Sequence, residues 1–148
     1  MINNFEMEIG GRVLSFEHGR VANQAAGAIT IQYGDTMLLA TAAASKNPRP
    51  GADFLPLTVD VAEKSYAAGK LPGGFFKREG RPATEAILAS RMIDRPIRPL
   101  FSKTIHNEIQ IIVTILATDN VNPYPALGIV GASTALAISD IAFNDPIG

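Results

Sequence analysis

Residues 108–119, EIQIIVTILATD, are apolar on both faces of an extended chain. A strand of this kind has to be paired on both edges and covered, as the inner strands of buried sheets are. The segment therefore predicts a central buried strand, and the rest of the chain must supply its neighbours.

Two glycine-centred turns predict those neighbours. Gly10-Gly11 separates FEMEI from RVLSFEHG, and Gly34-Asp35 separates AITIQY from TMLLATAAAS, so each predicts a β-hairpin. The alanine-rich run is also compatible with a helix, but the tight turn and its β-branched partner favour a strand. LTVDVAE, residues 57–63, alternates apolar and polar side chains as a half-buried strand does.

One helix is predicted before the central strand in the sequence, and another after it. The first begins at Thr84, and we expect Pro96 and Pro99 to end it. The second covers residues 126–139 and carries small residues that permit close packing, so we expect it to be buried. The order of elements predicts an α+β fold with an antiparallel or mixed sheet.

Composition limits the class of protein. A chain of 148 residues with 47% hydrophobic residues fits one domain with a real core, and the absence of cysteine excludes disulfides and thiolate metal sites. His18 and His106 have no companions at metal-ligand spacing. The start MINNFEMEIGGRV lacks the pattern of a signal peptide, and residues 127–139 are too few to span a bilayer. We expect a cytoplasmic domain with no membrane contact.

Charge is distributed unevenly. Residues 70–103 hold eight basic and three acidic side chains, a net +5, whereas the remaining residues hold five basic and eleven acidic ones, a net −6. A basic segment on an acidic body favours binding of a polyanion. A helix with a merely solvated charged face is the alternative.

The sharpest motif is GGFFKREGRP, residues 73–82, inside a glycine- and proline-rich segment that spans residues 64–82. Single-stranded nucleic acid binds by stacking bases on aromatic rings while cations contact the phosphates. The motif supplies both groups, in Phe75, Phe76, Lys77, Arg78 and Arg81. The alternative is that both rings fold back and anchor the loop to the core.

A second basic cluster lies on the first helix. Arg91 and Arg95 share one face at i and i+4, and Arg98 follows. Guanidinium groups suit a phosphate or RNA backbone. A structural network, with Asp94 orienting Arg91 or Arg95 and Glu85 as a further partner, is the alternative.

Several segments of the chain resemble the first RNase PH-like domain of the polynucleotide phosphorylase family. They are PGGFFKREGRP, ASRMIDRPIRPLF, NPYPALGIVGASTALAISDIAFNDPIG and the amino-terminal pattern of glycine, alanine and YGDT. The resemblance covers nearly the whole chain. It implies an RNase PH-like (ribosomal protein S5 domain 2-like) β-α-β-α core, truncated at residue 148. Lys77 departs from the family, which commonly has arginine there, and a lysine head group does not stack as a guanidinium does.

The resemblance also implies a function. The family degrades single-stranded RNA and mRNA from the 3′ end with inorganic phosphate, releasing nucleoside diphosphates, in a homotrimer whose central channel is constricted by the loop matching residues 73–81. It implies that the magnesium ligands and the phosphate-binding serines belong to a second core, which with the KH and S1 domains lies outside residues 1–148. We therefore expect no catalytic residue and no metal ligand in this chain, and an inactive isolated fragment. An endoribonuclease or a helicase is an expected partner of the whole protein.

Two other functions stay open. One is a non-catalytic subunit of an exosome-like ring that only threads RNA. The other is a metabolic enzyme whose arginines bind a small anion, which the aromatic and basic loop disfavours.

Overall fold

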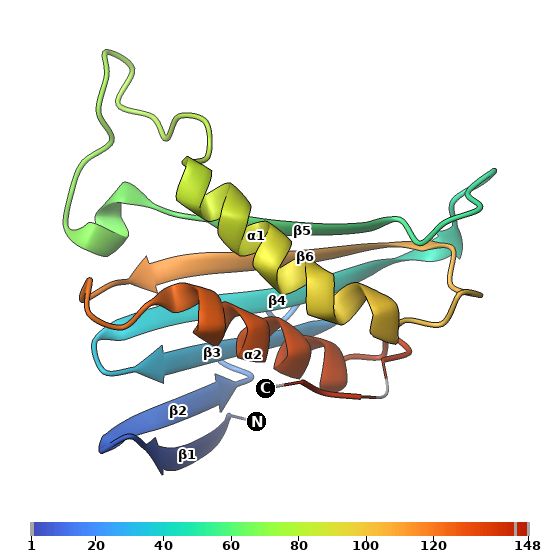
Figure 1. The fold of residues 1–148 in the computed structure, drawn as a ribbon, viewed down its shortest axis with the longest axis horizontal. Coiled ribbons are helices and arrows are strands. Elements are labelled where there is room, and N and C mark those ends of the chain that lie inside the picture. The colour runs from blue at the N-terminus through green and yellow to red at the C-terminus, as the bar shows by residue number, and fades with distance from the viewer. Residues whose placement is uncertain (1, 144, 148) are drawn as a thin grey trace.

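The computed structural model describes residues 2–143 and 145–147. Six strands form one sheet in the order β1-β2-β3-β4-β6-β5. Two helices cover one face of this sheet (Figure 1). The mixed sheet with segregated helices confirms the α+β prediction.

Both predicted hairpins are present. β1 (Asn3–Ile9) pairs antiparallel with β2 (Arg12–His18), and β3 (Gly27–Tyr33) pairs antiparallel with β4 (Thr36–Pro48). The turn glycines have φ of +60° at Gly10 and +60° at Gly34, values that residues with a Cβ rarely adopt. The alanine-rich segment is a strand, as predicted.

The apolar segment is β6 (Asn107–Ala117), which lies between β4 and β5 (Leu57–Ala62). It runs antiparallel to β4 and parallel to β5, so its position inside the sheet is confirmed. Its burial is one-sided, which corrects the expectation of cover on both faces. Ile111 is fully buried beneath the helices, whereas Gln110 and Ile112 on the opposite face are exposed and half-buried.

The helices α1 (Thr84–Ile97) and α2 (Tyr124–Ala137) lie over the sheet and contact each other. They form the core with the sheet's inner face, whose fully buried members include Ile31, Leu38, Ile93, Ile97, Ile109 and Leu136. α2 is buried as predicted but begins two residues earlier, at Tyr124. Its Gly131 lies so close to the sheet that an added Cβ would come within 3.1 Å of the Ala40 side chain.

Pro96 does not end α1, contrary to the prediction. The helix continues to Ile97 and passes into a 3-10 turn, η2 (Arg98–Leu100), that contains Pro99. A proline removes one hydrogen bond to the carbonyl four residues earlier. Here that carbonyl belongs to Met92, on a part of the helix where the side chain is 49% exposed, so water can replace the lost donor.

Between β5 and α1 the chain leaves the sheet. After a short 3-10 helix, η1 (Ser65–Ala68), no helix or strand follows until Thr84. We call residues 71–82 the aromatic–basic loop; it rises away from the body at the upper left of Figure 1. In the described part of the chain, neither α1 nor α2 has the length and apolar character that a membrane-crossing helix needs.

Candidate nucleic-acid interface

The tip of the aromatic–basic loop is a tight turn. The N–H of Lys77 donates to the carbonyl of Gly74 at 3.4 Å, which places Phe75 and Phe76 at the two central positions. Both ends of the turn have positive φ, +84° at Gly74 and +50° at Lys77. Residues other than glycine seldom adopt a positive φ, so the backbone conformation of Lys77 is an unfavourable one.

The two phenylalanines project into solvent. Phe75 is 93% exposed and Phe76 is 79% exposed, and their ring centroids lie 5.4 Å apart in an edge-to-face arrangement. The alternative in which both rings anchor the loop to the core is therefore wrong. An aromatic ring of this size is normally buried, because its transfer from water is favourable.

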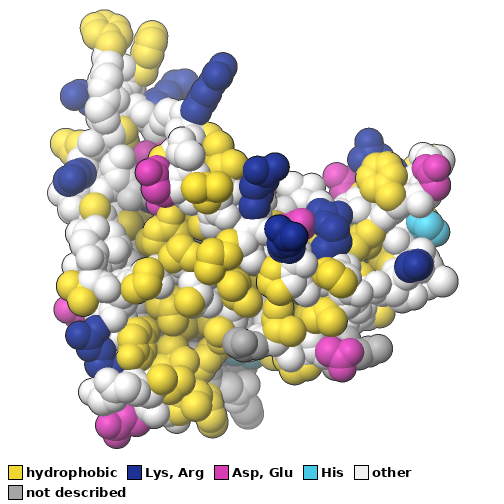
Figure 2. All heavy atoms as spheres, viewed as in Figure 1, with side chains coloured by type: hydrophobic (Ala, Val, Ile, Leu, Met, Phe, Trp, Pro, Cys, Tyr) yellow, Lys and Arg dark blue, Asp and Glu magenta, His cyan; other side chains and the backbone are white. Residues whose placement is uncertain are grey.

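Basic side chains share this tip. Lys77, Arg78 and Arg81 are exposed, and within the described residues none of them forms an ion pair. Figure 2 shows hydrophobic groups at the top of the protrusion with Lys and Arg groups beside them. Of the five residues predicted for RNA binding, Phe75, Phe76, Lys77 and Arg78 thus lie at or beside the tip turn, and Arg81 lies lower in the loop, where it lines a cavity; their role in binding stays a prediction.

The loop contains a contact that sequence reasoning missed. The carboxylate of Glu79 accepts the backbone N–H of Ser65 at 2.8 Å and the Ser65 hydroxyl at 3.0 Å. The one acidic residue among the loop's cations was the only available signal for such a contact. Its partner could not be predicted, because Ser65 belongs to a different turn.

A cavity of about 820 Å³ lies beneath the loop, between β5, η1 and the beginnings of both helices. Its lining includes acidic and basic groups of similar number, among them Asp60, Glu63, Lys64, Arg81 and Arg91. At its edge the Tyr124 hydroxyl donates to the Glu63 carboxylate. Burial, and then this hydrogen bond, raises the pKa of Tyr124 well above its usual range.

The arginines of α1 divide into two kinds. Arg91 and Arg95 are exposed and make no ion pair with any described residue. They line a hollow on the outer surface of α1 together with the half-exposed Leu88 and Met92. Their predicted contact with phosphate or RNA stays a prediction, and nothing in the described structure competes for their guanidinium groups.

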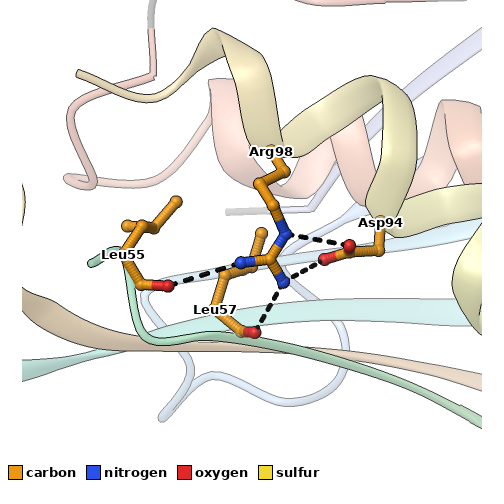
Figure 3. A network of polar contacts seen from close by, with 4 residues as sticks. All are labelled: Leu55, Leu57, Asp94 and Arg98. Carbon is orange, nitrogen blue, oxygen red and sulfur yellow. Dashed lines mark hydrogen bonds and ion pairs between the residues drawn. The ribbon is translucent and has the colours of Figure 1, made fainter. Parts of the chain in front are cut away.

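Arg98 is engaged within the protein (Figure 3). Its guanidinium donates to the Asp94 carboxylate at 2.9 Å and 2.7 Å, and to the carbonyls of Leu55 and Leu57 at 3.3 Å and 3.0 Å. The expectation that Asp94 orients Arg91 or Arg95 is wrong, because its carboxylate faces Arg98. For Arg98 the geometry favours the structural alternative.

Magnesium was expected from the resemblance, with ligands elsewhere. Among residues 2–143 and 145–147 no group of three or more acidic or histidine side chains lies close enough to hold a metal ion. The carboxylate of Asp119 accepts the N–H groups of Asn122 and Val121 and the hydroxyl of Thr36. These bonds, first that of Asn122, hold the pKa of Asp119 well below its usual range. Asp119 is therefore committed to the turn before α2, and we assign no step to a metal held here.

Comparison with known proteins identifies the fold. Residues 10–142 match the family described as "3′ exoribonuclease family, domain 1". Rrp46 from rice superposes with a TM-score of 0.64 at 16% identity, over 88% of this chain and 58% of that one. An exosome chain from Archaeoglobus fulgidus, solved with RNA bound to the active site, gives a TM-score of 0.62 at 16% identity, over 94% of this chain and 51% of that one.

Curated relatives are more similar in sequence. The polyribonucleotide nucleotidyltransferase of Roseiflexus sp. (strain RS-1) is 60% identical over 147 residues, 99% of this chain, and that of Heliobacterium modesticaldum is 57% identical over 144 residues, 97% of this chain. The chain spans 20% of the length of each of these relatives. The chain belongs to the 3′ exoribonuclease family, and residues 10–142 match its domain 1, the RNase PH domain.

Proposed function

We propose that this chain is the RNA-channel domain of a phosphate-dependent 3′-to-5′ exoribonuclease, a polyribonucleotide nucleotidyltransferase that degrades single-stranded RNA to nucleoside diphosphates. The observation that carries the proposal is the pair Phe75 and Phe76, 93% and 79% exposed beside three unpaired cations. Stacking of a base on an aromatic ring contributes about 1–3 kcal/mol per base. A ring that is exposed to solvent in the free protein is available for this stacking when RNA binds.

The charge distribution supports the same partner. Lys77, Arg78 and Arg81 of the loop and Arg91 and Arg95 on α1 are five cations of the basic segment, and none of them forms an ion pair with a described residue. Cations of this kind neutralise backbone phosphates and release counterions. The surrounding body is acidic, so the basic region directs a polyanion toward the loop.

The whole protein is proposed to resemble its relatives in more than this domain. The 60% and 57% identical relatives are about five times longer, which supports a second core that would hold the phosphate and magnesium sites. On this proposal the protein is a cytoplasmic homotrimer, and RNA passes three copies of the aromatic–basic loop in its central channel. RNA-degradation enzymes such as an endoribonuclease or a helicase are proposed partners.

Phosphorolysis tests the proposal. The full-length protein, given poly(A), inorganic phosphate and magnesium, should release adenosine diphosphate from the 3′ end. The control omits phosphate, and its release of adenosine monophosphate in place of the diphosphate would assign hydrolysis instead. RNA binding without any release would favour the non-catalytic ring subunit.

A further inference from the structure

We propose that Glu79 is a positioning residue, which ties the aromatic–basic loop to η1 and so fixes where Phe75 and Phe76 stand. The inference rests on the proposed function, because it assigns the acidic residue of an RNA-binding loop a part in holding that loop in place. It reverses the expectation that a carboxylate among RNA-binding cations only weakens binding.

The contact uses both oxygens of the carboxylate. Oε1 accepts the Ser65 N–H at 2.8 Å, and Oε2 accepts the Ser65 hydroxyl at 3.0 Å. Hydrogen bonds to an ionised acceptor are stronger than those between neutral groups. The backbone N–H of Ser65 is also the first of η1, and the first N–H groups of a helix have no partner inside it.

This contact is the loop's one polar attachment. Across the described residues, the two bonds from Ser65 to Glu79 are the only hydrogen bonds that join residues 71–82 to the rest of the chain. Apolar packing does not replace them, because Leu71, Phe75 and Phe76 are all at least 79% exposed. Without Glu79, no hydrogen bond from another part of the described chain would hold the loop that carries the rings.

The anchor itself is fixed to the sheet. The N–H of Thr118, directly after β6, donates to the carbonyl of Ala67 in η1 at 3.0 Å. Two hydrogen bonds close η1 at its end: the N–H of Gly69 donates to the carbonyl of Tyr66 at 2.9 Å, and the N–H of Lys70 donates to the carbonyl of Ser65 at 3.0 Å. A continuous path therefore leads from the sheet through η1 to Glu79, which lies three residues from Phe76.

Electrostatics alone gives the opposite expectation for RNA affinity. Glu79 is the one acidic residue in the aromatic–basic loop, among three cations. If it acted only as a charge, its neutralisation would remove repulsion from RNA phosphates and tighten binding. If it holds the loop, the same change lowers affinity, since the rings and cations must be ordered again on binding.

The experiment measures binding of a fluorescent single-stranded oligoadenylate to the full-length protein, with Glu79→Gln, Ser65→Ala and the wild type. Glutamine keeps the size of the side chain but loses the charge that strengthens both bonds, and Ser65→Ala removes the hydroxyl donor with no change of charge. We expect the affinity to fall about fivefold for Glu79→Gln and about threefold for Ser65→Ala, within the range of the net contribution of one hydrogen bond. Trypsin should cleave faster after Lys77 and Arg78 in both variants, at an unchanged melting temperature; Ser65→Ala is the stricter test, because Glu79→Gln also changes the residue that follows Arg78.

Glu85→Gln is the matched control. It removes the same charge six residues further on, and the Glu85 side chain makes no hydrogen bond or ion pair with any described residue. Its affinity should stay equal to the wild type or rise slightly.

Tighter binding by Glu79→Gln, with unchanged cleavage by trypsin, would overturn the positioning role. Should Glu79→Gln unfold, the uncharged Ser65→Ala decides alone. The variant Phe75→Ala with Phe76→Ala separates the two proposals, because its unchanged affinity would contradict the proposed function itself.

Discussion

The guanidinium of Arg98 donates two hydrogen bonds, at 2.9 Å and 2.7 Å, to the carboxylate of Asp94, one helical turn earlier. The same guanidinium reaches the carbonyls of Leu55 and Leu57, just before and at the start of β5. Arg98 thus ties the end of α1 to the sheet, while Arg91 and Arg95 of α1 form no ion pair with any described residue. Three arginines that look alike in sequence therefore differ in their contacts within the protein.

Arg98→Ala should destabilise the fold, whereas Arg95→Ala should not. The first change removes bonds to a carboxylate and to two carbonyls and should cost about 1–3 kcal/mol in the free energy of unfolding. The second removes an exposed side chain and should change it by less than about 0.5 kcal/mol. Urea unfolding of both variants checks this. Equal losses would contradict the division between them.

Arg95 should matter for RNA binding although it matters little for stability. Arg95→Ala in the full-length protein should weaken the salt dependence of RNA binding, because one phosphate contact fewer releases fewer counterions. Binding isotherms at several salt concentrations measure the slope. An unchanged slope in Arg95→Ala would remove Arg95 from the proposed interface.

Acid should destabilise the domain through Asp119. Its pKa in the folded state is held below the ordinary carboxyl value by the N–H groups of Asn122 and Val121. The folded state therefore binds fewer protons than the unfolded state, so this stabilisation is complete above about pH 4 and is lost as the pH falls toward the lowered pKa. Asp119→Asn should be less stable at pH 7, and its unfolding free energy should fall less steeply below about pH 4. An identical acid slope in the two proteins would contradict this assignment.

Close packing of α2 against the sheet predicts opposite tolerance at two glycines. A Cβ on Gly27 would lie 1.9 Å from the backbone oxygen of Ala135, so Gly27→Ala must displace α2 and should cost about 3 kcal/mol. At Gly128 the nearest atom is the end of the Ile93 side chain, at 2.8 Å, and alanine gains helix propensity of about 1 kcal/mol. Gly128→Ala should therefore be nearly neutral. Thermal melting of the pair tests the packing.

Much of the fold follows from local patterns in the sequence. The turns at Gly10-Gly11 and Gly34-Asp35 specify hairpins because a positive φ is needed there, and the apolar run of β6 specifies an inner strand. The exposed face of β6 could not be predicted, since Ile112 is as apolar as Ile111 and only tertiary packing separates them. Pro96 misled because the cost of a proline depends on where the freed carbonyl lies.

The candidate site was predictable in its residue types and not in its contacts. The composition of GGFFKREGRP points to RNA because rings and cations next to each other suit neither a core strand nor an ordinary surface loop. The pairing of Glu79 with Ser65, and of Asp94 with Arg98 in place of Arg91 or Arg95, depends on side-chain geometry. Sequence spacing places several candidates within reach and does not choose between them.

The central claim is that Phe75 and Phe76 are stacking surfaces for RNA. The most direct measurement is the affinity of the full-length protein for single-stranded oligoadenylate, set beside its melting curve, for Phe75→Ala combined with Phe76→Ala. Removing two buried phenylalanines would cost about 3–5 kcal/mol each, but rings 93% and 79% exposed should leave melting nearly unchanged. We expect RNA affinity to fall at least about fivefold, as the loss of one or two base stacks requires. Unchanged RNA affinity together with earlier melting would contradict the account.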